Sequence, residues 1–431
     1  MKFTFTRRIK FALVVVASIT GFTGAQLAFS SLSPTAVYSK DFIQEYLLAK
    51  AVLLGIDPYL PLPEVAKQVF GTVPAPVFPH PTPHTPALAV LSTPLGLVRY
   101  EYAAVLWLLL SIGCLIESVI LLLRYWGGRI KSWHVVLICW AALGWSPVWE
   151  DLVIGQTNLP LLLLLIVMWQ ALRKGEEILG GVILGCVIAL KLMAWPILIF
   201  LCLRRRWKSV FATFASAILL NLIALGAIGA NGMRNYYFEV GPLLSSLYRA
   251  HSDNFSAWTI GWRLFSGTGS NVAHGISAPP FIESPTLALI FGYVLPAVLL
   301  ITGLALAQRA GSFDLSIALL IAVGILVNPI AWGHYLVLVA IPAVIVTRRL
   351  VDLNFPGKET LLMAVIVFLL SLPGRFVTSL SSHFSKGEMP LETTLVPFGA
   401  SLITLLPAAC ILCLIWVTWW VSRKDYKLVL N

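Results

Sequence analysis

Charged side chains are scarce in this sequence. Only 11% of its 431 residues are Asp, Glu, Lys or Arg, whereas 58% are hydrophobic. A soluble domain carries about 25% charged residues, so this shortage excludes a water-soluble globular fold of this size. The mean hydropathy of +0.88 and the repeated long apolar runs predict that lipid surrounds much of the chain.

Cysteine is also uncommon, and none of the six cysteines lies in a large polar loop. This placement argues against a framework of disulfide bonds. Cys410 and Cys413 have the spacing of metal ligands, but no histidine or second cysteine pair flanks them, so we expect them to pack between helices. The sequence also lacks a DxD-type acidic pair, and we expect no metal and no other cofactor.

Acidic residues are outnumbered, because 30 Lys and Arg stand against 19 Asp and Glu and give a net charge of +11. Such an excess can indicate nucleic-acid binding. Here most of the basic residues lie in short linkers between apolar segments, where they mark the cytoplasmic side of a membrane protein. We therefore predict a cell-membrane protein with cytoplasmic N- and C-termini and no nucleic-acid partner. The N-terminal apolar stretch is either a cleaved signal peptide or a first helix, and its length of about 20 residues favours an uncleaved helix.

The apolar segments predict an all-α polytopic membrane protein with about 12 transmembrane segments in a single domain over residues 1–431. The segments lie at 9–30, 102–123, 133–149, 157–172, 178–203, 209–230, 286–308, 313–328, 331–347, 359–373 and 396–421.

The segment at 178–203 carries cytoplasmic signals at both ends, because Arg204, Arg205 and Arg206 follow it directly. We expect a re-entrant pair of half-helices, 178–190 and 193–203, with Lys191 near the apex. Broken helices occur at membrane depth where they line a cavity. A lysine there costs about 2.5–3.5 kcal/mol on insertion scales. Lys191 therefore needs a partner, and we favour an anion over a side chain that extends to the lipid headgroups.

Two large loops fall on the outer side, at 31–101 and 231–285, and a smaller one covers 374–395. The first loop holds a predicted interfacial helix at 42–54, whose apolar stripe comprises Ile43, Leu47, Ala51 and Leu54. Asp41 and Glu45 stand four residues apart on another face. They either stabilise a helix N-terminus or direct a carboxylate towards a substrate.

Two further patterns occur in the same loop. Asp57-Pro58-Tyr59 is a turn signal that either ends a helix structurally or serves a substrate directly. The Pro-rich stretch 74–86 contains His80 and His84, four residues apart. Because prolines exclude a regular helix there, we do not expect these histidines to bind a metal.

The remaining candidate residues lie near the predicted outer ends of other segments. Asn158 either caps a helix or, with Gln156, contacts sugar hydroxyls. Asn254 begins a glycosylation sequon, a match common by chance, and Arg263 follows in the same loop. His334 lies beside Trp332 and a proline break, which makes it a better site candidate than a lone interfacial histidine.

At these residues the chain resembles glycosyltransferase family 87 of the GT-C superfamily, from about 38 to 349. The motifs follow the family's order: an acidic-aromatic start, Gly-x-Asp-Pro-Tyr, His-Pro, Gly-Gln-x-Asn, Gly-x-x-x-Gly with a membrane lysine, and a Pro-x-x-Trp-x-His turn. They correspond here to Asp41-Phe42, Gly55 to Tyr59, His80-Pro81, Gly155 to Asn158, Gly181 to Lys191, and Pro329 to His334. The family's second histidine in the last motif is Tyr335 here, which puts any role needing two imidazoles in doubt.

The resemblance implies a GT-C fold and a hexosyltransferase that moves a sugar, mannose in the family, from a polyprenyl monophosphate carrier to a glycolipid or glycan at the outer face. It makes Asp41 the general base of an inverting displacement. The leaving lipid phosphate needs cations and donors, for which Lys191, Arg263 and His334 are the candidates. The expected substrate-binding residues are Glu45, Asp57, Tyr59, His80, Gln156, Asn158, Asn254 and Trp332.

Two rival classes remain. A transporter or flippase of lipid-linked sugars also suits many segments and a broken helix, but such proteins often contain internal repeats, and none is evident here. A surface-polysaccharide polymerase or ligase differs mainly in using a diphosphate-linked oligosaccharide as donor.

Overall fold

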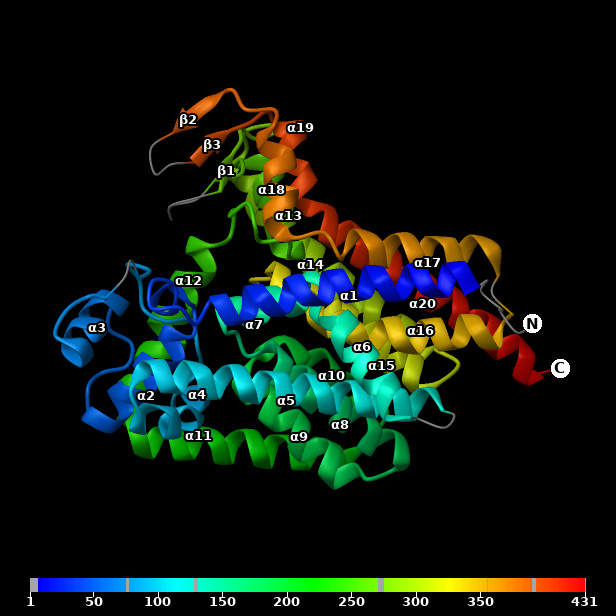
Figure 1. Cartoon of the computed structure of the whole chain (residues 1–431), viewed down its shortest axis with the longest axis horizontal. Helices are drawn as coiled ribbons and strands as arrows, with labels where there is room; N and C mark the ends of the chain where they lie inside the picture. The colour runs from blue at the N-terminus through cyan, green and yellow to red at the C-terminus, as the bar shows by residue number, and fades with distance from the viewer. Residues whose placement is uncertain are drawn as a thin grey trace. The chain divides into compact units, whose positions relative to one another are not determined.

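The computed structural model describes residues 7–74, 77–127, 131–269, 275–354, 356–389 and 393–430. Within these ranges the chain is helical apart from one small sheet, which confirms the all-α class (Figure 1). The chain forms two compact units. The first comprises Met1–Lys191 and Lys208–Pro242, and the second comprises Leu192–Trp207 and Leu243–Asn431.

The first unit contains the N-terminal helices and the long helix α11. Its elements are α1 (Arg7–Ser30), η1 (Val37–Ser39), α2 (Ile43–Leu54), α3 (Leu62–Phe70), α4 (Pro86–Leu91), η2 (Thr93–Leu97), α5 (Tyr100–Trp126), α6 (Ser132–Leu143), α7 (Ser146–Ile154), α8 (Asn158–Lys174), α9 (Glu177–Leu190), α11 (Trp207–Asn235) and the π-helical η4 (Tyr236–Val240).

Helix α2 lies at the centre of the core that carries the first loop. It packs against α3, α4, α5 and η2, and a chain of aromatic rings runs through the contact. Phe42 stacks on Trp107 at 5.5 Å between ring centroids, and Tyr46 meets Tyr100 edge to face at 5.1 Å. Because α2 has neighbours on most sides, Glu45 is buried. Leu54, the last residue of the helix, is 56% exposed. Of the predicted apolar stripe, Ile43, Leu47 and Ala51 are buried against protein and Leu54 is exposed, and the contact of this helix with lipid stays a prediction.

Helices α9 and α11 approach closely because α9 carries glycines at one-turn spacing. A Cβ at Gly181 or Gly185 would overlap backbone atoms of α11. The Thr213 hydroxyl donates to the Gly181 carbonyl at 3.0 Å, and the Ser216 hydroxyl donates to the Val182 carbonyl at 2.9 Å. The Gly-x-x-x-Gly motif thus lets two apolar helices pack through their backbones.

The second unit contains the rest of the chain. Its elements are η3 (Leu192–Ala194), α10 (Trp195–Leu203), α12 (Gly241–Leu247, which begins at the boundary), α13 (Ala257–Phe265), β1 (Ile276–Ser277), α14 (Pro285–Gln308), α15 (Phe313–Val327), η5 (Gly333–Val339), α16 (Ala340–Asp352), α17 (Gly357–Leu369), α18 (Gly374–Ser382), β2 (Gly387–Met389), β3 (Thr393–Leu395), α19 (Phe398–Ser401), η6 (Leu402–Leu405) and α20 (Leu406–Leu430).

Helix α15 forms the core of this unit, because it is buried from Asp314 to Val327 and packs against α10, α14, α16 and α20. A three-stranded sheet in the order β1-β3-β2 joins two distant parts of the chain (Figure 1). β1 runs parallel to β3, and β2 runs antiparallel to it. This sheet could not be predicted from the sequence, because its strands have only two or three residues each.

The chain is a multi-pass membrane protein. Among the described residues, five helices are long and apolar enough to cross a membrane, or seven spans if each of two bent helix pairs counts as one. The pairs are α6 with α7, bent by 73°, and α17 with α18, bent by 84°. Three other predicted segments correspond to apolar helices of 10–17 residues, Glu177–Leu190, Leu192–Leu203 and Phe313–Val327, which are shorter than the ~20 residues that a helix normally needs to span.

The predicted break at Lys191 is confirmed. α9 ends at Leu190, Lys191 has an extended backbone with φ −156° and ψ 117°, and a 3-10 turn then leads into α10. The re-entrant course of the two half-helices and the total of about 12 segments stay predictions.

Candidate active site

The segment that carries Asp41 is fixed to the C-terminal end of α7. The Phe42 N–H donates to the Ile154 carbonyl at 3.1 Å. The Lys40 ammonium donates to the carbonyls of Leu152 at 3.1 Å and Val153 at 2.6 Å, and to the Ser31 hydroxyl at 2.6 Å. The last carbonyls of a helix lack partners within the helix and attract cations. Lys40 therefore holds the residue next to it, Asp41, at this helix end.

Gly155 makes this contact possible. It ends α7 with φ 76°, in the left-handed region that favours glycine, and a Cβ there would lie 2.7 Å from the Cβ of Phe42. The indole N–H of Trp107 donates to the Gly155 carbonyl at 2.8 Å. The glycine of the Gly-Gln-x-Asn motif is thus required by both backbone conformation and space.

Asp41 is half-buried, and the motif's glutamine supports its carboxylate. Gln156 Nε2 donates to Asp41 Oδ2 at 3.0 Å, whereas Oδ1 accepts no hydrogen bond from the described residues. Burial raises the pKa of Asp41 above its ordinary value, while the Gln156 hydrogen bond and the positive charge of Lys191 oppose that rise. One oxygen of Asp41 is thus held by Gln156, and the other is available to a substrate. The raised pKa makes the carboxylate a stronger base.

Lys191 belongs to the same unit and ends a chain of buried polar contacts. Its ammonium donates to Asn158 Oδ1 at 2.9 Å, and Asn158 Nδ2 donates to Asp151 Oδ1 at 2.7 Å. The backbone N–H of Leu159 donates to the other Asp151 oxygen at 3.3 Å. The predicted anionic partner is therefore reached through an amide, because Asn158 links Lys191 to the carboxylate of Asp151.

Asn158 does not cap α8, which corrects one of its two sequence interpretations. The N-cap residue is Thr157, and no side-chain cap hydrogen bond is present there. The Asn158 side chain is fully buried, and both ends of its amide are used by Asp151 and Lys191. In this arrangement Asn158 positions Lys191, and Gln156 is the motif amide that lies beside Asp41.

Glu45 and His84 form a buried pair that the sequence did not reveal. Glu45 Oε1 lies 3.1 Å from His84 Nε2, and the two side chains are 0% and 11% exposed. Burial raises the pKa of Glu45 well above its ordinary value, and burial together with the nearby Lys191 charge lowers the pKa of His84 to about 3. Burial thus disfavours the charged form of both side chains. His84 was considered only as a metal-ligand partner of His80, although its actual partner lies 39 residues upstream.

The acidic turn of the first loop has structural contacts. Asp57 Oδ1 accepts from the Tyr59 N–H at 2.9 Å, and Asp57 Oδ2 accepts from the Asn235 amide at 3.4 Å. The buried Tyr59 hydroxyl donates to the His84 carbonyl at 3.1 Å. These contacts favour the structural interpretation of Asp57-Pro58-Tyr59. His80 is buried, and its ring stacks on Phe78 at 5.3 Å.

The second unit holds the other candidates. Arg263 is fully buried, and its guanidinium donates to the carbonyls of His251, Ser252 and Asn254 at 2.6–2.9 Å. It also donates to the hydroxyls of Thr404 at 2.6 Å and Thr259 at 3.3 Å. Burial lowers the pKa of Arg263 to about 9. Arg263 therefore fixes the loop at 251–254, and its donors are used by the protein.

Asn254 is equally enclosed. Its Nδ2 donates to the carbonyls of Tyr248 at 3.1 Å and Pro329 at 3.0 Å, and its Oδ1 accepts from the N–H groups of Ser256 and Ala331 at 3.0 Å each. The side chain thus ties two loops together. Because it is 0% exposed, the sequon at Asn254 is inaccessible in the folded chain.

Trp332 and His334 lie in the segment that Asn254 holds. The Trp332 ring meets His251 edge to face at 5.1 Å between centroids, and the His334 ring lies 5.2 Å from Tyr335. Both Trp332 and His334 are half-buried. The structure thus brings together Asn254, Arg263 and Trp332 in one loop cluster, separate in sequence from the cluster of Asp41, Gln156, Asn158 and Lys191.

The cysteines and the groups that could bind a metal give no further site among the described residues. All six cysteines are free. Within the part of the chain that the structure describes, no group of three or more His, Cys, Asp or Glu side chains is arranged to hold a metal ion.

Two proteins of Mycobacterium tuberculosis are similar to this chain. The polyprenol-phosphate-mannose-dependent alpha-(1-2)-phosphatidylinositol pentamannoside mannosyltransferase of strain CDC 1551 is 26% identical over 337 residues, which cover 75% of this chain and 68% of the relative. The polyprenol-phosphate-mannose-dependent alpha-(1-2)-phosphatidylinositol mannoside mannosyltransferase of strain H37Rv is 25% identical over 280 residues, 62% of this chain and 61% of the relative. No solved structure matches the chain.

The family model for glycosyltransferase family 87 matches residues 83–329, which are more than half of the chain. This range contains the Gly-Gln-x-Asn motif, Lys191, Asn254 and Arg263, whereas Asp41 precedes it and Trp332 and His334 follow it. The chain therefore belongs to glycosyltransferase family 87 and is a membrane glycosyltransferase.

Proposed function

We propose that this protein transfers a mannosyl group from a polyprenyl monophosphate carrier to a glycolipid or glycan acceptor, with Asp41 as the general base. The observation that carries the proposal is the half-buried Asp41 carboxylate, which is held through Oδ2 by Gln156, while Oδ1 has no donor among the described residues. The two mycobacterial relatives are named for a polyprenol-phosphate-mannose donor and phosphatidylinositol mannoside acceptors.

The reaction is an inverting displacement. Asp41 takes the proton of an acceptor hydroxyl while the oxygen of that hydroxyl forms a bond to the anomeric carbon. The bond between that carbon and the phosphate oxygen breaks, and the polyprenyl phosphate leaves with the electron pair. The Lys191 ammonium, positioned by Asn158, stabilises the negative charge on the phosphate.

The other roles inferred from the resemblance remain part of the proposal. These are a GT-C fold in a single membrane domain, an outer active site formed by the loops at 31–101 and 231–285, and donor-phosphate binding by Arg263 and His334. The guanidinium of Arg263 is surrounded by five protein acceptors. We therefore expect Arg263 to act by holding the loop at 251–254 in place.

The test uses purified full-length protein with labelled polyprenyl-phosphate-mannose and membrane lipids as acceptors. We expect a labelled glycolipid product, and we expect Asp41→Asn to reduce its rate by about 10²–10⁴-fold, the usual contribution of a general base. Glu64→Gln is the matched control, because Glu64 is an exposed acid on α3 in the same loop.

Full activity of Asp41→Asn would remove Asp41 from the mechanism. The two rival classes predict other outcomes. Movement of the labelled donor across a vesicle membrane without a glycosylated product would instead identify a flippase. Transfer only from a diphosphate-linked oligosaccharide would identify a polymerase or ligase.

A further inference from the structure

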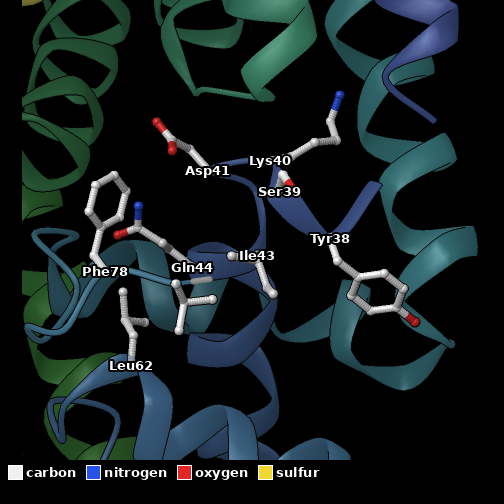
Figure 2. Close-up of a pocket in the computed structure, with 9 residues that line it drawn as sticks. Tyr38, Ser39, Lys40, Asp41, Ile43, Gln44, Leu62 and Phe78 are labelled. Carbon is white, nitrogen blue, oxygen red and sulfur yellow. The ribbon is translucent and has the colours of Figure 1, made fainter. Parts of the chain in front are cut away.

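A small pocket opens beside Asp41 in the first unit (Figure 2). It encloses about 250 Å³, including the space at its mouth. Its lining comprises Tyr38, Ser39, Lys40, Asp41, Ile43, Gln44, Leu62, Val77 and Phe78. The pocket is open to solvent on one side, so it can contact one part of a ligand and leave the rest of that ligand outside.

Gln44 gives the pocket an amide whose oxygen has no partner. The side chain is 4% exposed, and Oε1 accepts no hydrogen bond within the described part of the chain. An orphaned buried acceptor costs about 1–3 kcal/mol, so such a group usually meets a donor when the site is filled. A ligand hydroxyl supplies that donor. Figure 2 shows the Gln44 amide directed towards Phe78.

Phe78 provides an aromatic face at the same pocket. It is 38% exposed, and the His80 ring stacks on it at 5.3 Å with an angle of 20° between the planes. The stack holds the phenyl ring in place. The face of an aromatic ring is electronegative, so it attracts the weakly positive C–H bonds on one side of a sugar ring.

Asp41 completes the arrangement. In the view of Figure 2, Asp41, Gln44 and Phe78 lie on one side of the backbone segment, and Lys40 and Tyr38 point the other way. Because Gln156 occupies only Asp41 Oδ2, Oδ1 can accept a further hydroxyl proton.

We propose that this pocket binds one hexose ring of the acceptor: Phe78 stacks on the ring, Gln44 bonds one hydroxyl, and a second hydroxyl faces Asp41. The inference rests on the proposed function and adds a substrate subsite to it. A ligand hydroxyl at this position would supply the donor that the buried Gln44 oxygen lacks among the described residues.

Saturation-transfer-difference NMR with the full-length protein in nanodiscs tests the subsite directly. The probes are methyl α-D-mannopyranoside and methyl α-D-glucopyranoside. We expect saturation of the ring protons of at least one hexoside. Gln44→Met and Phe78→Leu should each weaken its affinity about 3- to 10-fold, the effect of losing one hydrogen bond or ring contact.

Two matched controls and one conservative variant accompany these changes. Gln68→Leu removes an exposed glutamine from α3, and Phe29→Ala removes an exposed phenylalanine from α1, so neither should alter binding. Phe78→Trp keeps the aromatic face and should retain binding. Absence of saturation for both hexosides, or equal affinity in Gln44→Met, Phe78→Leu and the unaltered protein, overturns the proposal.

Failure of the subsite and failure of the proposed function give different results. Asp41→Asn should still bind the hexoside while losing transfer. If hexoside binding depends on Gln44 and Phe78 but no mannose is transferred from polyprenyl-phosphate-mannose, the subsite is supported and the proposed reaction is wrong. If mannose is transferred and the KM for the acceptor is unchanged in Gln44→Met and Phe78→Leu, the reaction is supported and the subsite is wrong.

Discussion

At the scale of single residues, the structure separates groups that face the proposed reaction from groups that hold them. Asp41 has an available oxygen, whereas Asn158 and Arg263 are enclosed by protein partners. The sequence predicted Asp41 through the family resemblance and Lys191 as a lysine inside an apolar segment, and the roles of both stay predictions. It could not identify Asp151 or His84 as partners, because those contacts depend on how distant segments pack.

The pH dependence of the reaction provides a test of Gln156. Asp41 acts as a base only when ionised, so activity is present above its pKa and is lost as the pH falls through it. Gln156 lowers that pKa, so Gln156→Leu should move the acidic limb of the kcat/KM profile to higher pH by about one unit.

The matched control for this measurement is Gln170→Leu on α8, since Gln170 donates only to the Leu121 carbonyl. An acidic limb that stays at the same pH in Gln156→Leu would show that Gln156 does not act on the base.

At the scale of elements, apolar length predicted most helix bounds within a few residues. The segment predicted at 209–230 is α11 (Trp207–Asn235), and the interfacial helix at 42–54 is α2 (Ile43–Leu54). The neighbours of α2 could not be predicted, because an apolar stripe on one side of a helix does not show whether protein or lipid covers the other sides. In the structure, protein covers the side that carries Glu45, and Glu45 is buried.

The contact between α9 and α11 gives a prediction at this scale. Gly181→Ala places a methyl group against the Ser209 backbone, and overpacking of this kind costs about 1–3 kcal/mol. We expect a lower Tm in detergent and weaker transfer, because α9 carries Lys191 at its end.

Gly226→Ala on α11 is the control, because a Cβ there meets nothing within 4 Å. Equal Tm values for the two alanine variants would show that the two helices are not held at this glycine.

At the scale of the whole molecule, the positive charges predict an orientation in the membrane. Residues of the first loop should face outwards, and the linker after Arg173 and Lys174 should face the cytoplasm. Charge placement carries this information in the sequence alone, whereas the division into two compact units depends on long-range packing and had no sequence signal.

Labelling of single cysteines in a variant without the six native cysteines checks the orientation. A membrane-impermeant maleimide should label Glu64→Cys in intact cells, and it should label Glu176→Cys only after permeabilisation. Both positions are exposed. The reverse pattern would place Asp41 on the cytoplasmic side and exclude an outer active site.

The attachment of Lys40 to α7 has a mechanical consequence. Asp41 is adjacent to a side chain clamped on Leu152 and Val153, and Phe42 is bonded to Ile154. The proposed base is thus attached to the end of a short helix that is bent by 73° against α6. Because Lys40 and Phe42 are both bonded to that helix end, the position of the carboxylate depends on the orientation of α7.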